Sequence, residues 1–119
     1  MTPIVAVKIQ NQDTVPVARL EGEIDILNAS EIGIQLFGAA PNTAPGLVVD
    51  LSRTTYLDSR GVQMLVELAE RMRRRQQRLR VVVPERSVVR RVLQLSHLDA
   101  SVPLDHTVEE AVTHLRKEQ

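Results

Sequence analysis

The sequence predicts an α/β domain in which helices pack on a β-sheet. After two β-branched runs near the N-terminus, apolar strand-like runs alternate with segments whose apolar residues recur at helical spacing. The 119 residues are enough to bury a single core, and no repeat, low-complexity segment or linker divides them. We therefore expect one domain over residues 1–119, with an approximate core at residues 4–116.

The N-terminal part predicts a β-hairpin followed by a helix. Ile4–Ile9 and Val15–Leu20 are β-branched runs, and the polar turn cluster Asn11–Thr14 separates them. Gly22–Asp25 then leads into a segment with apolar residues at helical spacing. These residues are Ala29, Ile32, Leu36, Phe37 and Ala40. Two prolines in Pro41–Pro45 end this helix.

The middle of the chain predicts a central strand and the next helix. Leu47–Leu51 is too uniformly apolar for an edge strand with one wet face, so we expect it at the centre of the sheet. A helix begins near Ser59, and five residues form its apolar face. They are Val62, Leu65, Val66, Ala69 and Met72. The arginines of Arg71–Arg75 suit the negative end of this helix, and Leu79–Val83 is a fourth strand that ends at Pro84.

The C-terminal part predicts two more helices, which makes about four in all. The third helix carries the apolar residues Val88, Val89, Val92, Leu93 and Leu95. Ser96–Asp99 ends it, and Val102–Leu104 is short and strand-like. Thr107–Glu110 has the spacing of a capping box and opens the last helix. The apolar residues of that helix are Val108, Ala111, Val112 and Leu115.

The composition excludes several classes of function. Fifteen basic and fifteen acidic residues balance, so no overall field attracts nucleic acid or an anionic membrane. The basic run Arg71–Arg80 is interrupted by Gln76 and Gln77, and we interpret it as a solvated helix end rather than a nucleic-acid site. The chain lacks cysteine and an apolar run long enough to span a membrane. We expect a cytoplasmic protein.

The sequence offers no catalytic or metal-binding pattern. His106 and His114 are eight residues apart, whereas a helical metal pair is four apart, and we expect these two and His97 to be surface residues. The chain has no glycine-rich phosphate loop and no nucleophile elbow. Ser59 has no histidine near it in sequence to act as a base. We expect neither an enzyme nor a bound cofactor or metal.

The junction between Tyr56 and Gly61 is the most informative stretch. Asp58 or Ser59 falls where a helix prefers a capping oxygen. A serine there has its hydroxyl near free backbone N–H groups and the positive end of the helix dipole, where a phosphate can be held or added. The residues alone favour the simpler interpretation, in which Asp58 caps the helix and Ser59 is its first residue.

Two further apolar residues of the same helix have two interpretations. Met64 and Leu68 lie one turn apart, beside the main apolar face and towards the Ser59 end. They either form a wide apolar arc between the sheet and a neighbouring helix, or an exposed patch that binds a partner. Ile34, on the preceding helix, has the same two interpretations, but its sequence position supports an exposed patch less strongly.

Taken together, these segments resemble the STAS domain of bacterial anti-sigma-factor antagonists over nearly the whole chain. The order and spacing of the segments carry the resemblance. They are Leu20–Asp25, Leu47–Ser52, Tyr56–Gly61, Leu79–Val83 and Val89–Ser96 followed by Leu98. The fold that this resemblance implies is a small mixed sheet with parallel central strands, an N-terminal β-hairpin and about four packed helices.

The resemblance also implies a switch. In such proteins the serine that matches Ser59 is phosphorylated by an anti-sigma factor that is itself a serine kinase. The unmodified antagonist captures the kinase and frees a sigma factor, and a metal-dependent serine phosphatase reverses the phosphorylation. Asp25 matches an aspartate associated with partner recognition. The expected partner surface comprises Asp25, Asp58, Ser59, Arg60, Gly61, Met64 and Leu68.

Two positions depart from the family pattern. Arg60 stands where serine or threonine is usual, and His97 stands where glycine is frequent. Arg60 either pairs with a phosphate on Ser59 or marks a divergent member regulated by another route. The alternative function is therefore a scaffold or ligand-sensing STAS protein that phosphorylation does not control.

Overall fold

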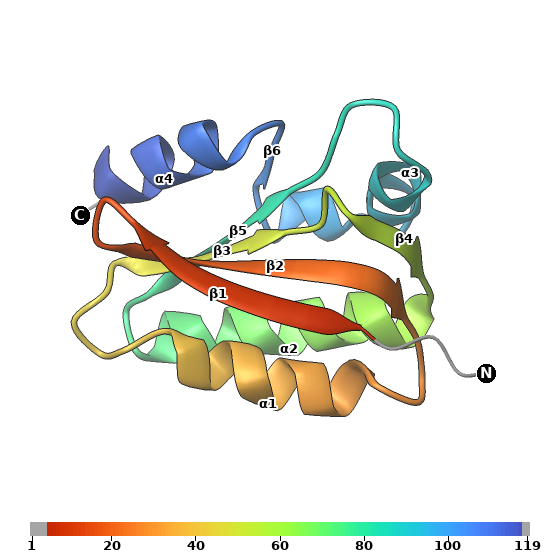
Figure 1. Ribbon diagram of the computed structural model, residues 1–119, viewed down its shortest axis with the longest axis horizontal. Helices are drawn as coiled ribbons and strands as arrows, with labels where there is room; N and C mark the ends of the chain where they lie inside the picture. Colours follow the sequence, from red (N-terminus) through yellow and green to blue (C-terminus); the bar gives the residue numbers. More distant parts are fainter. Residues whose placement is uncertain (1–4, 118–119) are drawn as a thin grey trace.

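The structure, a computed structural model, describes residues 5–117 of the chain. It has the expected α/β architecture (Figure 1). The strands are β1 (Ala6–Gln12), β2 (Val15–Ile24), β3 (Gly46–Asp50), β4 (Thr54–Leu57), β5 (Arg78–Val82) and β6 (Leu104–Asp105). The helices are α1 (Ala29–Ala39), α2 (Ser59–Arg74), α3 (Val88–Leu95), the short 3₁₀ helix η1 (Leu98–Ala100) and α4 (Val108–Lys117).

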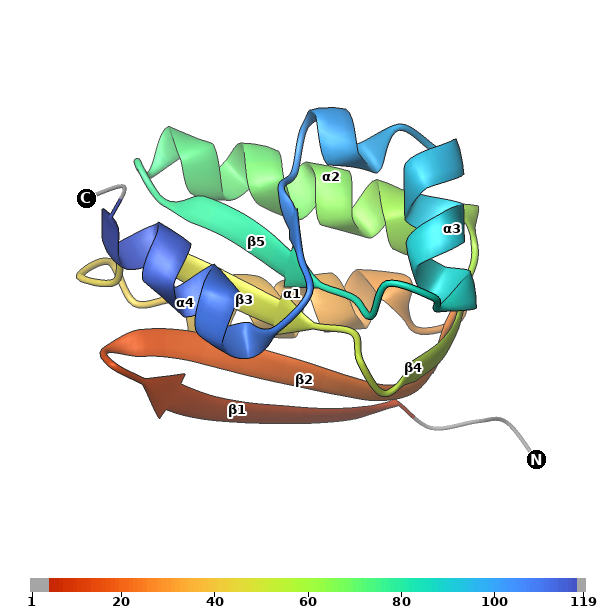
Figure 2. The same ribbon diagram turned by 90° about the horizontal axis from the view of Figure 1, so that it is seen from above.

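The sheet is mixed, with parallel strands at its centre. Its order is β1-β2-β3-β5-β6, and β4 pairs with the second half of β2. Only the β1–β2 pair is antiparallel, so the carboxyl ends of the other described strands point to one end of the sheet. Helices α1 and α2 cover one face and α4 covers the other, while α3 lies beside β4 at the carboxyl ends (Figures 1 and 2).

The predicted hairpin is confirmed. Asp13 and Thr14 have positive φ angles of 51° and 70°, as a tight two-residue hairpin turn requires, and the register starts at Gln12 opposite Val15. Ile4, where we expected the first strand to begin, lies outside the described residues. Strand β2 is longer than predicted, because it continues to Ile24.

The sheet separates two apolar cores. The larger core lies between the sheet and the helices α1 and α2, and the smaller core lies under α4. All five residues of β3 are buried, and β3 lies between β2 and β5, which confirms the prediction of a central strand. Two buried valines show the alternation, because Val49 faces the larger core and Val48 faces the smaller one.

The expectation of an exposed patch at Met64 and Leu68 is wrong. Their exposed fractions are 5% and 3%, and both belong to the larger core. The reason is that α1 packs beside α2: a Cβ atom placed on Gly33 of α1 would lie 3.0 Å from Met64 Cγ. The missing side chain at Gly33 lets the two helices approach, and the approach covers Met64 and Leu68. Ile34 remains exposed, at 69%.

The prediction did not include strand β4. The sequence indicated no strand between Leu51 and the helix that begins near Ser59, whereas Thr54–Leu57 forms a parallel strand beside β2. The register shifts between Gly22 and Glu23, and Gly22 has a φ angle of 116°, which favours glycine. The Thr54 hydroxyl donates a buried hydrogen bond of 2.8 Å to the Leu20 carbonyl. Strand β4 thereby brings the start of α2 beside the end of β2.

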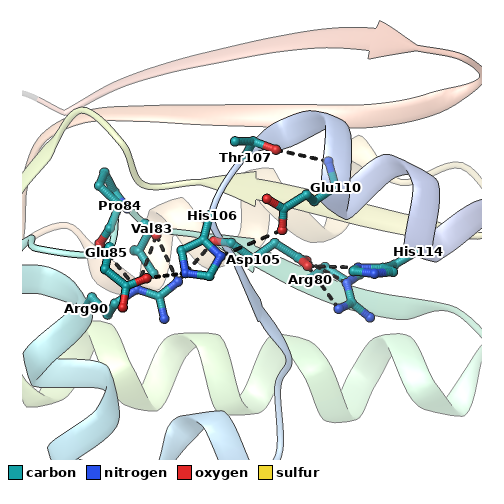
Figure 3. A network of polar contacts seen from close by, with 10 residues as sticks. All are labelled: Arg80, Val83, Pro84, Glu85, Arg90, Asp105, His106, Thr107, Glu110 and His114. Atoms are coloured by element: carbon teal, nitrogen blue, oxygen red, sulfur yellow. Dashed lines mark hydrogen bonds and ion pairs between the residues drawn. The ribbon is translucent and has the colours of Figure 1, made fainter.

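The C-terminal elements follow the prediction, and a polar network fixes α4 (Figure 3). Asp105, at 2% exposed, accepts bonds of 2.6 Å and 3.1 Å from Arg80 and contacts His114 Nδ1 at 2.8 Å. Thr107 Oγ1 accepts from the Glu110 N–H at 3.1 Å, as a capping residue does. The network therefore joins β5, β6 and α4.

Arg90 fixes the start of α3, and His97 follows the end of this helix. The buried guanidinium of Arg90 donates to the carbonyls of Val83, Pro84 and Asp105 at 3.0–3.3 Å (Figure 3). His97 follows the helix in a left-handed conformation with a φ angle of 60°. Glycine adopts this conformation without a steric cost. This explains why glycine is frequent at this position in the proteins that the sequence resembles.

Two features are absent from the described residues. None of the helices in residues 5–117 is long and apolar enough to cross a membrane. Within the same part of the chain, no group of three or more histidine, aspartate or glutamate side chains could hold a metal ion.

Candidate functional site

Two short segments meet at the carboxyl end of the sheet, and Asp58 joins them. The first segment, Asp25–Asn28, follows β2, and the second, Asp58–Gly61, follows β4. The Asp58 N–H donates to the Ile24 carbonyl at 3.2 Å, and Asp58 Oδ2 accepts from the Ile26 N–H at 3.2 Å. Residues that are more than 30 positions apart in the chain are therefore held side by side.

Local hydrogen bonds determine the shape of the first segment. Asp25 Oδ1 accepts from the Leu27 N–H at 2.9 Å, which forms a turn typical of aspartate. Asn28 Oδ1 accepts from the Asp25 N–H at 3.0 Å, and Asn28 Nδ2 donates to the Glu23 carbonyl at 2.9 Å. Asp25 is half-buried and holds the turn, and the apolar side chains of Ile26 and Leu27 lie outside it.

The expected cap on α2 is confirmed, and Asp58 is the capping residue. Its Oδ1 accepts from the N–H groups of Arg60 and Gly61 at 3.0 Å and 3.1 Å. These are donors that a helix start otherwise leaves unpaired. We expected free backbone N–H groups near the Ser59 hydroxyl. This is wrong for the N–H groups of Arg60 and Gly61, because the Asp58 carboxylate accepts from both.

Ser59 is the first residue of α2 and is exposed. In the described part of the chain its hydroxyl has no hydrogen-bond partner. It lies at the positive end of a 16-residue helix, where the dipole favours negative charge. A modifying enzyme can therefore reach the hydroxyl without unfolding the domain.

Gly61 allows the first turn of α2 to pack closely on the strands. A Cβ atom at this position would lie 2.3 Å from Leu57 Cδ1 and 3.1 Å from Ile24 Cγ2. Real Cβ atoms do not approach other heavy atoms to 2.3 Å, so a larger residue here would push the helix start away from β2 and β4. Gly61 thus has a packing role beside the proposed site.

Exposed apolar side chains surround the junction. Ile26 and Leu27 are 67% and 75% exposed, and Tyr56, two residues before Asp58, is 47% exposed. None of these three residues was expected in the partner surface. The signal was present for Ile26 and Leu27, because an apolar pair stands between a strand end and a helix start, outside the periodicity of either element. Large exposed apolar side chains next to one another indicate a binding surface.

Arg60 lies beside Ser59 in sequence but belongs to a different face of the helix. It lines a cavity of about 240 Å³ between α1 and α2, together with Gln63 and Glu67. Met64 and Leu68 also line this cavity, although they are almost completely buried. Consecutive residues of a helix do not face each other, so Arg60 and Ser59 present their side chains in different directions.

Comparison with known proteins places these features in one family. The model of the family described as "Mlab, STAS domain" matches residues 7–108. The anti-sigma-F factor antagonist RsfB of Mycobacterium tuberculosis is 30% identical over 113 residues, which cover 94% of this chain and 90% of RsfB.

Solved structures agree with the family model. An anti-sigma factor antagonist from Mycobacterium paratuberculosis superposes with a TM-score of 0.83 at 28% identity, covering 95% of each chain. The phosphorylated form of the Bacillus cell fate determinant SpoIIAA has a TM-score of 0.63 at 22% identity, and the match covers 92% of this chain and 99% of SpoIIAA. At that identity the second likeness shows the shared fold.

Proposed function

Because the chain belongs to the STAS-domain family, we propose that it is an anti-sigma factor antagonist. Its partner is an anti-sigma factor, and binding that partner releases a sigma factor for transcription. The 30% identity to an anti-sigma-F factor antagonist over 94% of the chain supports this function. The domain acts by binding and needs no catalytic group of its own.

The partner surface comprises the junction of the two segments and the apolar side chains around it. Asp25 and Asp58 hold the backbone of this surface, and Ile26, Leu27 and Tyr56 provide its apolar contacts. This surface differs from the one expected from the sequence, because Met64 and Leu68 are buried and contribute to it only through the packing of α1 on α2. Arg60 contributes at the border of the surface.

Ser59 is the switch. In this proposal the partner is a serine kinase that binds the unmodified protein and phosphorylates Ser59, and a metal-dependent serine phosphatase restores binding. The observation that carries the proposal is the exposed Ser59 hydroxyl at the start of α2, next to Asp58 and the exposed Ile26. A substrate serine must be accessible, and a switch must lie within the surface that it controls.

The physical effect of phosphorylation is electrostatic. A phosphate adds a charge of about −1.5 to −2 at neutral pH. In the free protein, water and the helix N-terminus stabilise that charge, but a docked partner would remove the water at a cost of several kcal/mol. The phosphate also lies next to the Asp58 carboxylate, whose Oδ2 holds the Ile26 N–H. Since about 1.4 kcal/mol changes affinity tenfold, this cost is enough to release the partner.

The test is a binding titration with the anti-sigma factor encoded beside the protein's sigma factor. We expect Ser59→Ala to bind like the wild type and Ser59→Asp to bind at least about tenfold more weakly. Thr113→Asp is the matched control, since Thr113 is exposed on α4, on the opposite face of the sheet. Equal binding by Ser59→Ala and Ser59→Asp would refute the switch.

Intact mass separates the switch from the alternative of a scaffold without phosphoryl control. After incubation with ATP and the kinase, the wild type should gain one phosphate and Ser59→Ala none. An anti-sigma factor that binds the protein but never phosphorylates it would favour the scaffold, while the antagonist function itself would stand.

A further inference from the structure

The outer edge of β1 is open. Strand β1 stands at one end of the sheet order and, among the described strands, pairs only with β2. Figure 2 shows β1 at the border of the fold, and neither α1 nor α4 extends past it. All seven residues of β1 pair with β2 without a bulge. A regular strand at a border offers a row of backbone N–H and C=O groups to another strand.

The register of the hairpin shows which backbone groups face this edge. Gln12 and Val15 flank the two-residue turn, and the pair that flanks such a turn exchanges both of its backbone hydrogen bonds. Bonded and non-bonded pairs then alternate along β1. Asn11 belongs to a non-bonded pair, because Pro16 stands opposite it and proline has no N–H. Three residues therefore point their backbone N–H and C=O groups away from β2. They are Val7, Ile9 and Asn11.

Strand β1 lacks the features that usually protect an open edge. Proteins protect such edges with charged side chains, prolines, bulges or very short strands. Strand β1 contains no proline and no bulge, and Lys8 is its single charged residue. The strand at the opposite border, β6, has two residues and is protected by its length. Strand β1 can therefore pair with a strand of another chain.

An exposed apolar side chain lies at the middle of this edge. Ile9 is the central residue of β1 and is 47% exposed. It shares a face of the sheet with Val7, which packs against the larger core, because alternate residues of a strand face the same side. A further strand beside β1 would cover Ile9, and the burial of its apolar surface would stabilise the pairing.

A second copy of β1 fits the edge in one antiparallel register. When a two-fold axis passes through Ile9, the two strands pair over the whole of Ala6–Gln12. Val7 of one copy then lies opposite Asn11 of the other, and the two Ile9 residues lie opposite each other. These outward-facing residues exchange two hydrogen bonds per pair, about six in all. The two Ile9 side chains meet at the axis.

The charge of Lys8 favours the same register. Lys8 of one copy lies opposite the uncharged Gln10 of the other, and it keeps its ion pair of 3.3 Å with Glu21 of its own chain. A register that places Val7 opposite Ile9 would instead bring Lys8 opposite Lys8, and like charges directly opposite each other are destabilising. A shift in the other direction would bring Val7 opposite Asp13 of the turn, where no strand continues.

We propose that the outer edge of β1 is a self-association surface, through which two copies of the chain form a dimer with one continuous sheet. The interface is symmetric, since the same edge of both copies forms it. Antiparallel pairing points the carboxyl ends of the two β2 strands in opposite directions. The two Ser59 surfaces therefore lie at opposite ends of the joined sheet, and both stay uncovered. The dimer does not depend on the proposed switch.

The test is sedimentation of the full chain over a wide range of concentrations. We expect an equilibrium between the monomer and a dimer of twice its mass. Ile9→Lys places two lysines opposite each other at the axis, so it should dimerise at least about tenfold more weakly while its circular dichroism stays unchanged. Leu95→Lys is the matched control, because Leu95 is 71% exposed on α3, away from β1 (Figure 2), and it should dimerise like the wild type.

Two substitutions of Gln10 test the register. Gln10→Glu places a carboxylate opposite Lys8 of the other copy, twice in each dimer, so we expect dimerisation to become about fivefold tighter. Gln10→Lys places like charges there and should weaken dimerisation by about the same factor. Gln10 is exposed, and a general disturbance of folding would not give effects of opposite sign.

Hydrogen exchange identifies the backbone groups of the interface. At high protein concentration, the outward-facing amides of Val7, Ile9 and Asn11 should exchange with deuterium more slowly than at low concentration. The amides that already donate to β2 should change little. They are those of Ala6, Lys8 and Gln10.

Four results would overturn the proposal. A chain that remains monomeric at millimolar concentration would exclude the dimer. A dimer that Ile9→Lys leaves unchanged would place self-association on another surface. Effects of Gln10→Glu and Gln10→Lys in the same direction would refute the register. A monomer in which Ile9→Lys abolishes binding of the anti-sigma factor would show that the partner, rather than a second copy, adds a strand to this edge.

Discussion

Truncation of Leu68 measures whether this residue is core or binding surface. Leu68 is 3% exposed and packs where α1 covers α2. Leu68→Ala removes three carbon atoms, and each buried methylene contributes about 0.8 kcal/mol. The cavity that remains adds to this loss, because the neighbouring side chains relax only partly. We expect the free energy of unfolding to fall by about 3 kcal/mol.

That loss is large enough to measure by thermal denaturation. Unfolding entropies of about 2.1 cal/mol/K per residue give about 250 cal/mol/K for 119 residues. A loss of about 3 kcal/mol then lowers Tm by about 12 °C. Circular dichroism at 222 nm follows the transition, and urea unfolding gives an independent free energy.

Ile34→Ala is the control for this experiment. Ile34 is 69% exposed on α1, so its truncation should change stability by less than about 0.5 kcal/mol. Below the melting transition, folded Leu68→Ala should bind the anti-sigma factor like the wild type. The reasoning would be wrong if Leu68→Ala melted within about 2 °C of the wild type and lost binding, because Leu68 would then be part of the partner surface.

Three further predictions concern other parts of the domain. Arg80→Ala leaves the buried Asp105 without its bidentate partner, so we expect a loss of about 3 kcal/mol in urea unfolding, and a loss under 1 kcal/mol would show that solvent reaches the carboxylate. Leu27→Asp places a charge on the exposed junction, so we expect an unchanged Tm and at least about tenfold weaker binding of the anti-sigma factor by calorimetry; unchanged binding would remove Leu27 from the surface. His97→Gly relieves a left-handed conformation, so Tm should rise with a gain of about 1 kcal/mol, and a lower Tm would contradict the assigned strain.

Local patterns were sufficient for most of the elements. The β-branched runs around Asn11–Thr14 predicted the hairpin, and the uniformly apolar Leu47–Leu51 predicted the central strand. The cap at Asp58 was also predictable, since a side chain that bonds N–H groups two and three residues ahead depends only on nearby residues. In each case the deciding interaction is local or follows from apolar periodicity.

The arrangement of the candidate site was not predictable in this way. Strand β4 pairs with β2, which lies more than 30 residues earlier in the chain. Its own sequence, Thr54–Leu57, is too short to show whether it forms a strand or a loop. Met64 and Leu68 were equally ambiguous, because a wide apolar arc is the same in sequence whether a second helix covers it or not. The close approach at Gly33 decides that question.

The sequence by itself determined the order of the strands and helices other than β4, the family resemblance and the position of Ser59 at a helix start, because periodicity, turn chemistry and capping depend on neighbouring residues. The tertiary structure decided which apolar side chains are covered and that Asp58 joins the two segments through Ile26. These features depend on contacts between segments far apart in the chain, and only the packed fold brings those segments together.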